Sequence, residues 1–295
     1  MSQPPNAPAE PVKTLVVDGL GLAKSIRKDL ADQVQKLVDA GKRPPCLAVV
    51  LVGDDPASLS YIKGKQRACA RVNMNSIEHA LPAATSQPTL LELIDELNRD
   101  DAVDGILVQL PLPAAISPEA IAEAIDPAKD ADGIHPVNAG RLLAGTADLV
   151  ACTPLGIMAV LDHHQVPLEG SEAVVIGRSD IVGKPVSILL QQRNATVTLC
   201  HSRTRDLPGV CRRADILVAA TGRPRMVKRG WIKPGAAVID VGVSEVNGEL
   251  IGDVDFDTAL GVASIITPSR RGIGPMTITM LLRNTLHAYR KRVGE

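Results

Sequence analysis

The sequence predicts an α/β protein of two domains, each built on a parallel sheet, with a cleft between the domains. Three observations support this fold class. The chain has 295 residues, enough for two domains. Short apolar runs alternate with helical patterns in both halves, an order typical of parallel sheets. Aromatic residues are scarce, at one Trp, two Tyr and one Phe, so the core must consist of Val, Ile, Leu and Ala, which suits strands buried on both faces.

Composition excludes several classes of protein. A hydrophobic content of 45% and a charged content of 22% are ordinary for a soluble globular protein, and a net charge of −1 creates no field that would attract nucleic acid or an anionic membrane. No apolar run approaches the roughly 20 residues that span a bilayer. The five cysteines lack metal-ligand spacing, so we expect reduced thiols, no metal site and a cytoplasmic location. Residues 1–11 do not resemble a signal peptide and are expected to form a disordered tail.

The first domain is expected over residues 12–150. Apolar residues at every fourth position from Leu22 to Val38 predict a helix over 21–40, which Gly41 ends. The apolar run 46–52 predicts a buried strand, and the Asp-Asp-Pro that follows it is typical of a helix start. The remaining elements expected here are a strand over 76–81, a helix over 87–99 and a strand over 104–110.

One helix of this domain carries a candidate site. Tyr61 and Lys65 lie four residues apart and share a face that continues to Cys69 and Val72, so this face turns inward. A lysine on an inward face is costly unless it has a task. From the residues alone, both side chains could still lie at the surface. The second face of the helix, interpreted as a solvated basic stripe, carries Lys63, Arg67 and Arg71.

Two further stretches of the first domain contain polar candidates. Gln109 lies at the carboxyl end of a predicted strand, the edge where open α/β sheets bind ligands, although a structural role is equally compatible with the residues. The stretch K-D-A-D-G-I-H-P, residues 129–136, holds Asp130, Asp132 and His135. The plain interpretation of this stretch is a turn whose side chains bind their own backbone, with His135 as a turn residue and not a metal ligand.

The second domain is expected over residues 151–274. Thr153 is expected to cap a helix over 154–164. A closing helix within 275–295 would return to the first domain. The strands expected in the second domain are residues 173–176, 195–200, 215–219, 236–241 and 262–266.

The stretch V-V-I-G-R-S-D-I-V-G-K-P, residues 174–185, predicts a nucleotide site. A strand, a glycine turn and a helix beginning near Ile181 would present free backbone N–H groups to a phosphate. The dinucleotide fingerprint G-x-G-x-x-G is incomplete, because Ser179 stands between Gly177 and Gly183 where a glycine is usual. An ordinary strand-to-helix turn therefore remains an alternative.

Basic residues favour NADP over NAD as the cofactor. After the strand over 195–200 comes H-S-R-T, at the place where a dinucleotide fold meets the adenosine ribose. This place offers Ser202 and Arg203 and has no acidic residue before Asp206, and Arg178 adds a second cation. Basic residues accommodate a 2′-phosphate, whereas an acidic residue would bind the 2′-hydroxyl of NAD.

Nine motifs in order identify a family. Tyr-x-x-x-Lys beside a dinucleotide site also suggests a short-chain dehydrogenase, but there the motif follows the glycine turn, whereas here it precedes it by more than a hundred residues. The chain instead resembles the bifunctional methylenetetrahydrofolate dehydrogenase/methenyltetrahydrofolate cyclohydrolase (FolD) family over nearly its whole length. The motifs are S-Y-I-K-G-K, D-G-I-L-V-Q-L-P-L-P, K-D-A-D-G-I-H-P-V-N-A-G-R-L, C-T-P-L-G, V-I-G-R-S-D-I-V-G-K-P, C-H-S-R-T, V-I-D-V-G-V, G-D-V-D-F and G-I-G-P-M-T.

The resemblance implies a function. The first domain would bind a folate and the second NADP. The enzyme would oxidise methylenetetrahydrofolate to methenyltetrahydrofolate and hydrolyse that product to 10-formyltetrahydrofolate, in the one-carbon metabolism that serves purine biosynthesis. The family further suggests a homodimer, whereas the expectation of a cytoplasmic protein that binds neither nucleic acid nor a membrane comes from the cysteines, the net charge and the apolar runs.

The resemblance also implies residue roles. Lys65 would be the catalytic base, Tyr61 would pack on the substrate and orient the lysine, and Gln109 would hydrogen-bond near the reacting centre. Asp132 would bind the amino edge of the pterin. The full set of implied substrate contacts is Tyr61, Lys65, Val108, Gln109, Leu110, Asp132, Gly272 and Pro275. The implied cofactor contacts are Gly177, Arg178, Ser179, Ser202, Arg203 and Val243.

Two positions depart from the family pattern. T-P-S-R-R-G-I-G-P-M-T places Arg270 and Arg271 where the family usually has a Pro-Gly pair, and Ala151 replaces a proline. Both arginines could point to solvent or meet the glutamate tail of the substrate, or they could alter folate binding. The alternatives to a bifunctional enzyme are therefore a monofunctional dehydrogenase with impaired cyclohydrolase and a weakly active NADP- or folate-binding protein.

Overall fold

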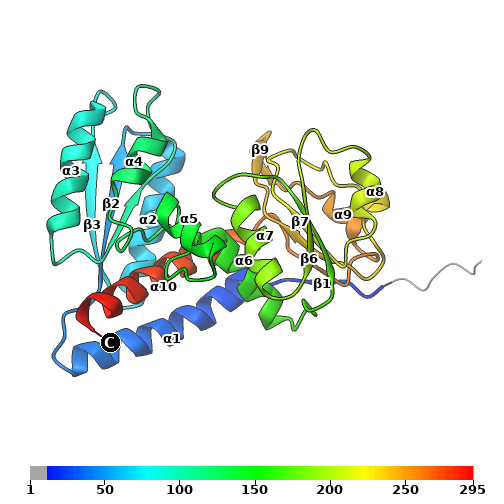
Figure 1. Ribbon diagram of the computed structural model, residues 1–295, viewed down its shortest axis with the longest axis horizontal. Helices are drawn as coiled ribbons and strands as arrows, with labels where there is room; N and C mark the ends of the chain where they lie inside the picture. Colours follow the sequence, from blue (N-terminus) through cyan, green and yellow to red (C-terminus); the bar gives the residue numbers. More distant parts are fainter. Residues whose placement is uncertain (1–11, 295) are drawn as a thin grey trace, which may run out of the picture. The chain divides into compact units, whose positions relative to one another are not determined.

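The computed structural model describes residues 12–294 and, within them, all side chains except those of residues 56–60 (Figure 1). The predicted disordered tail over residues 1–11 lies outside the described residues. The chain forms two compact units. Unit 1 comprises the described residues up to Gly19 together with Val160–Ile273, and unit 2 comprises Leu20–Ala159 together with the residues from Gly274 onward.

Unit 2 is built on a parallel sheet of three strands in the order β3-β2-β4. The strands are β2 (Cys46–Val52), β3 (Asn75–Leu81) and β4 (Gly105–Val108). Every residue of β2 is buried, because this strand lies in the centre and is covered on both faces. Its continuous Val- and Leu-rich sequence is the pattern expected of such a strand.

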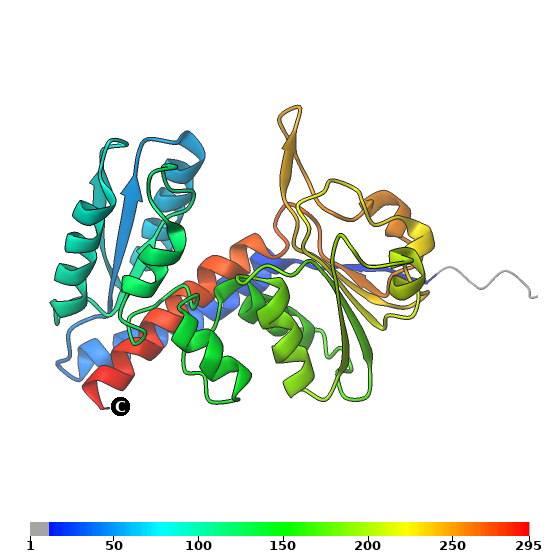
Figure 2. The same cartoon turned by 45° about the horizontal axis from the view of Figure 1, so that its top comes forward.

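Helices cover both faces of this sheet, and Figures 1 and 2 show α3 on one side of β2 and α2 on the other. On the side that α3 and α4 cover, Ala48, Val50 and Val52 of β2 pack against apolar side chains of both helices. On the second side, α10 packs against α2, β2 and β4. The helices are α1 (Gly19–Asp39), α2 (Pro56–Arg71), α3 (Gln87–Arg99), α4 (Pro118–Ala124), α5 (Pro136–Leu143), α6 (Cys152–His163) and α10 (Gly274–Val293).

Unit 1 is built on a parallel sheet of six strands in the order β1-β11-β8-β7-β5-β6. From β5 the chain goes first to β6 on one side and then to β7 on the other. In open α/β sheets, such a reversal of strand order marks the ligand site, at the carboxyl ends of the two strands. The strands are β1 (Leu15–Val16), β5 (Glu172–Ile176), β6 (Thr196–Cys200), β7 (Ile216–Ala219), β8 (Ala237–Asp240) and β11 (Ile265–Ile266).

Short elements complete unit 1. They are α7 (Gly183–Gln192), α8 (Leu207–Cys211), the 3-10 helix η1 (Arg229–Trp231), α9 (Phe256–Ala259) and an antiparallel hairpin of β9 (Ser244–Val246) and β10 (Glu249–Ile251). Leu207, Trp231 and Phe256 pack against the buried side chains of one sheet face. None of the described helices combines the length and apolar character needed to cross a membrane. All five cysteines are buried and unpaired.

The predicted fold class, with two α/β parts and parallel sheets, is confirmed, and β2 and α3 have the predicted bounds. The start of the chain differs from the prediction. Residues 12–19 were assigned to the first domain, whereas β1 pairs with β11 in unit 1, where Leu15 N donates to Ser264 O at 2.8 Å. A strand of two residues is too short to show a periodicity that would have predicted this pairing.

Candidate functional site

Helix α2 turns Lys65 into the interior of unit 2, as its spacing predicts. Lys65 is 6% exposed, and Cys69 and Val72 on the same face are fully buried. The basic stripe on the second face is exposed, as predicted. Tyr61, one turn before Lys65, keeps 38% of its surface exposed and so can contact a ligand.

The Lys65 amine has two neighbours that fix its place. Nζ donates a hydrogen bond to Gln109 Oε1 at 2.9 Å and lies 4.7 Å from the centre of the Tyr61 ring. Gln109 Nε2 donates to the carbonyl of Leu110 at 2.6 Å, which leaves the amide oxygen facing the lysine. The structure thus brings together three of the four predicted catalytic residues.

Burial prepares Lys65 to act as a base. Desolvation lowers the pKa of Lys65, and the nearby Asp132 charge opposes this shift. Burial raises the pKa of Tyr61 to about 12, with Asp132 adding to the effect, so the phenol stays protonated near neutral pH. Lys65 is therefore the better base of the pair.

The two aspartates of K-D-A-D-G have different tasks. Asp130 is 1% exposed and accepts hydrogen bonds from Gly133 N at 3.1 Å, His135 N at 2.9 Å and Asn138 Nδ2 at 2.8 Å. This carboxylate organises the turn. Asp132 is half-buried and interacts electrostatically with Lys65; its own burial raises its pKa, and the Lys65 charge opposes that shift. The turn therefore presents Asp132 as the fourth member of the site.

His135 is a turn residue, as predicted. Its Nδ1 accepts a hydrogen bond from Val137 N at 3.0 Å and so caps α5. Among the described residues, no group of three or more His, Cys, Asp or Glu side chains has metal-binding geometry.

Two residues that the sequence did not single out support Asp132. Cys152 N donates to Asp132 O at 3.2 Å, and its buried thiol lies close enough to interact with the Asp132 carboxyl. Asn284 of α10 is buried and donates to Ala131 O and Val150 O, both at 2.9 Å. The contacts of Asn284 join residues more than a hundred positions apart, so they leave no local pattern in the sequence. For Cys152 there was one signal, since it begins the motif C-T-P-L-G.

The other predicted substrate residues lie in varied surroundings. The Val108 side chain joins the apolar core, so only its backbone can meet a ligand, whereas Leu110 is 37% exposed. Gly272 belongs to unit 1 and Pro275 to unit 2. A Cβ on Gly272 would lie 2.2 Å from Pro268 O, so this glycine is required by its own turn.

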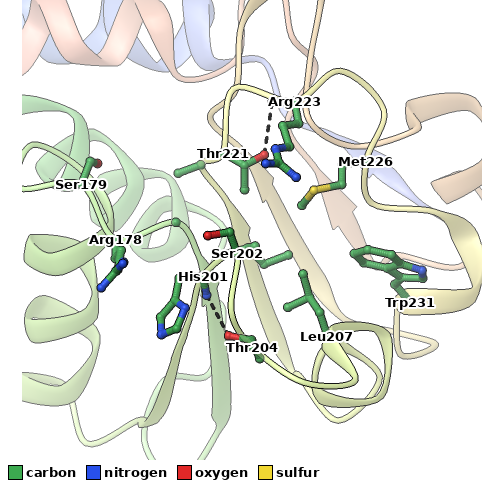
Figure 3. Close-up of a pocket in the computed structure, with 13 residues that line it drawn as sticks. Arg178, Ser179, His201, Ser202, Thr204, Leu207, Thr221, Arg223, Met226 and Trp231 are labelled. Carbon is green, nitrogen blue, oxygen red and sulfur yellow. Dashed lines mark hydrogen bonds between the residues drawn. The ribbon is translucent and has the colours of Figure 1, made fainter.

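A cavity of about 590 Å³ opens at the carboxyl ends of β5, β6 and β7 in unit 1 (Figure 3). Gly177, Arg178 and Ser179 follow β5, and Ser202 follows β6, so four of the six predicted cofactor residues line it. The further lining residues are Ile176, His201, Thr204, Leu207, Ala220, Thr221, Arg223, Met226 and Trp231.

The cavity fits a dinucleotide with an extra phosphate. In Figure 3, Arg178 and His201 lie toward one end, and Leu207, Met226 and Trp231 lie toward the other. Apolar side chains suit a base, and an arginine suits a phosphate. No carboxylate is found among the described lining residues, so nothing on this wall would bind the 2′-hydroxyl or repel a 2′-phosphate.

Comparisons with known proteins identify the family. Residues 17–132 match the model of the tetrahydrofolate dehydrogenase/cyclohydrolase catalytic domain, and residues 151–293 match that of the NAD(P)-binding domain of the same family. The chain belongs to the tetrahydrofolate dehydrogenase/cyclohydrolase family. The resemblance that the nine motifs indicate is thereby confirmed.

Relatives match this family member over nearly their whole length. It is 55% identical to Bifunctional protein FolD 2 of Geobacter sulfurreducens, over 92% of this chain and 96% of that protein. The crystal structure of the bifunctional enzyme FolD from Campylobacter jejuni has a TM-score of 0.92 at 43% identity, covering 95% of this chain and 99% of that one. The Trypanosoma brucei FolD, solved with NADP cofactor and an inhibitor, has a TM-score of 0.91 at 40% identity, covering 96% and 99%.

Three details of the cofactor region in this family member differ from expectation. Helix α7 begins at Gly183, not near Ile181. Ser179 Oγ accepts from Val182 N at 3.2 Å and Gly183 N at 3.4 Å, so these N–H groups are not free for a phosphate. Arg203 and Val243 are exposed but do not line the cavity. Side chains, more than the helix terminus, are therefore left to bind phosphate.

The loop where this family member departs from the usual pattern is strained at one residue. Arg271 has φ +65°, in the left-handed region that favours glycine. Its guanidinium lies 3.6 Å from Asp18, and both side chains are mostly exposed. Arg270 is exposed as well. The arginine pair thus points outward from unit 1 and fills no part of the described cavity.

Proposed function

We propose that the protein oxidises methylenetetrahydrofolate with NADP and hydrolyses the methenyl product to 10-formyltetrahydrofolate. The observation that carries this proposal is the buried Lys65 amine, held by Gln109 and the Tyr61 ring beside Asp132. Each of these residues has the chemistry that one of the two steps requires. The family membership of the chain supports the same pair of activities.

In the first step, the methylene carbon between N5 and N10 loses a hydride and becomes the methenyl cation. When NADP is bound, its nicotinamide ring supplies the hydride acceptor. The Tyr61 ring, with 38% of its surface accessible, offers a face on which the folate can pack. A neutral Lys65 avoids repulsion of the cation that forms.

In the second step, water adds to the methenyl carbon while Lys65 Nζ accepts a proton from it. The C–N5 bond then breaks as the added hydroxyl becomes the formyl carbonyl and releases its proton to solvent. N5 receives the proton held by the lysine, and the formyl group remains on N10. Gln109 Oε1 holds Nζ at 2.9 Å, so the amine is already oriented when water arrives. Asp132 would bind the amino edge of the pterin, since two carboxylate oxygens suit two N–H donors.

For the cofactor, Arg178 and Ser202 would hold the 2′-phosphate, and Arg203, which follows Ser202 in the sequence, remains a proposed contact. Gly177 has φ +118°, and a Cβ there would lie 2.0 Å from Ala220 O, so glycine keeps this turn tight under the cofactor. Ser179 and Val243 remain proposed contacts. In this proposal, unit 2 binds the folate and unit 1 binds NADP.

The cellular compartment, the metabolic role and the oligomeric state are also proposals. Five unpaired buried thiols suit a reducing cytoplasm. The product, 10-formyltetrahydrofolate, is a one-carbon donor suited to purine biosynthesis. A homodimer is proposed from the family resemblance.

The test gives the purified protein methylenetetrahydrofolate with NADP and then with NAD, and follows reduced cofactor and methenyl product separately. We expect NADPH without accumulation of the methenyl compound. Lys65→Met should abolish hydrolysis and leave NADP binding unchanged. Equal hydrolysis by this variant and the parent would show that the lysine assignment is wrong.

The remaining outcomes of this test decide between the alternatives. NADPH with accumulating methenyl product would indicate a monofunctional dehydrogenase. No reduction with either cofactor would indicate a binding protein. Either result would direct attention to the strained loop at Arg270 and Arg271.

A further inference from the structure

One wall of the cofactor cavity is the loop that follows β7. Residues 220–227 follow β7, and Thr221, Arg223 and Met226 of this loop line the cavity (Figure 3). Thr221 Oγ1 accepts a hydrogen bond from Arg223 N at 3.2 Å. The position of this turn therefore determines where the side chains of Thr221 and Arg223 meet a ligand.

The segment 252–254, part of the motif G-D-V-D-F, holds this loop. Asp253 Oδ2 accepts hydrogen bonds from Thr221 N and from Gly222 N, the latter at 3.1 Å. Val227 N donates to Asp253 O at 2.9 Å, and Arg225 N donates to Gly252 O at 2.8 Å. The Asp253 side chain thus anchors the start of the loop, and the backbone carbonyls of Asp253 and Gly252 anchor its end.

The Asp253 carboxylate is costly for stability. Asp253 is fully buried, and no described residue donates a hydrogen bond to its Oδ1. A Cβ on Gly242 would lie 2.1 Å from Oδ1, so only glycine at this position leaves room for the carboxylate. Burial, together with the Asp253 charge, raises the pKa of the neighbouring Asp240 to about 7. A half-satisfied buried carboxylate costs free energy that an apolar side chain would not.

We infer that Asp253 is a positioning residue for cofactor binding, which fixes the Thr221–Arg223 turn against the cofactor. The two N–H groups that it holds are adjacent, so its carboxylate sets the direction of the turn as well as its place. A neutral acceptor would bind them more weakly, because charge-assisted hydrogen bonds are about twice as strong. This inference rests on the assignment of the cavity to NADP made above.

The test measures NADP affinity of the full-length protein through the fluorescence of Trp231, the single tryptophan, which lines the cavity. Asp253→Ala should raise the Kd for NADP about tenfold or more, since two buried N–H groups lose their acceptor. Asp253→Asn should raise it about threefold, because an amide oxygen accepts both bonds without the charge. The KM for the folate should stay unchanged in both variants. Asp257→Ala, which removes an exposed carboxylate of the neighbouring helix α9, should stay within about twofold of the parent.

A merely structural role would give a different result. It would lower the unfolding temperature and leave the Kd for NADP of the folded protein unchanged. A parent-like Kd in Asp253→Asn, together with a parent-like Kd in Asp253→Ala wherever the latter folds, overturns the inference. Ser202→Asp tests the cavity assignment independently, because a carboxylate there would repel the 2′-phosphate. If Ser202→Asp weakens NADP and the Asp253 variants do not, only the inference fails; if none does, the cavity assignment fails.

Discussion

Two opposing effects act on the amine of Lys65, the proposed base, and burial is the larger of the two. Burial disfavours the ammonium form and lowers the pKa of Lys65, whereas the charge of Asp132 favours that form. The reaction needs the neutral amine, so the hydrolysis rate should rise with pH through this pKa and level off above it. The position of that rise reports the pKa of Lys65, which the Asp132 charge keeps higher than burial alone would.

Asp132→Asn should move the rise in hydrolysis rate to lower pH. The substitution removes the charge that favours the ammonium form, so the pKa of Lys65 falls further. The KM for the folate should increase, since an amide is a poorer partner for the pterin edge. The measurement is the pH profile of kcat for hydrolysis. Asp148→Asn, an exposed carboxylate of the same unit, should leave the profile in place, and a shift to higher pH in Asp132→Asn would contradict the argument.

Arg178→Ala should reduce the preference for NADP over NAD. Arg178 lines the cavity whereas Arg203 does not, so the first arginine should carry more of the binding to the 2′-phosphate. A hydrogen bond to a charged group contributes about 1.5–3 kcal/mol, which predicts that NADP binds roughly tenfold or more weakly while NAD changes little. Titration of both cofactors checks this. A larger effect of Arg203→Ala would place the phosphate outside the described cavity.

Spacing predicts the orientation of single residues better than it predicts their neighbours. The four-residue step from Tyr61 to Lys65 and Cys69 correctly predicts an inward face. Spacing alone does not distinguish Asp130 from Asp132, which only the family resemblance separates, because the difference lies in which carboxylate receives the backbone N–H groups of the turn. The hydrogen bonds of Asn284 to residues more than a hundred positions earlier could not be predicted, since they depend on the packing of α10.

At the scale of elements, the turn 130–135 depends on one glycine. Gly133 has φ +72°, and a Cβ there would lie 2.2 Å from the backbone of Val150. Gly133→Ala should therefore cost about 3 kcal/mol or more and raise the KM for the folate by displacing Asp132. Thermal unfolding and folate kinetics measure the two effects.

Gly145 provides a matched control for this prediction. It has φ +74°, but nothing lies within 4 Å of a Cβ built on it. Gly145→Ala should cost only the roughly 1–2 kcal/mol of a left-handed backbone and leave the folate KM unchanged. Equal losses of stability in the two variants would show that backbone strain, and not the contact with Val150, makes Gly133 necessary.

Element length decides which helices and strands the sequence could predict. The seven residues of β2 and the thirteen of α3 show clear patterns, and both are found with the predicted bounds. The hairpin of β9 and β10 has strands of three residues, and α9 has four residues. Such elements are held by neighbours distant in sequence, so their own residues carry little periodicity.

At the scale of the whole molecule, the chain passes three times between the two units, after Gly19, Ala159 and Ile273. The closing helix belongs to unit 2, in agreement with the expected return to the first domain. The pairing of β1 with β11 was not predicted, because a strand of two residues is too short to show a periodicity. The resulting organisation ties the first described residues to the sheet that carries the cofactor cavity.

Binding of NADP should therefore protect the start of the chain from hydrogen exchange. Leu15 N and Val17 N donate to carbonyls flanking and within β11, so these amides become exposed when unit 1 unfolds. A ligand at one hundred times its Kd stabilises the unit that binds it by about 2.7 kcal/mol, which slows exchange through unfolding of that unit roughly a hundredfold. We expect this slowing in β1, β5 and β7 and little change in β2 and β3; tetrahydrofolate should give the reverse. Equal slowing in both sheets with either ligand would mean that the two units unfold together, whereas no slowing in β1 with NADP would separate this strand from the cofactor-binding unit.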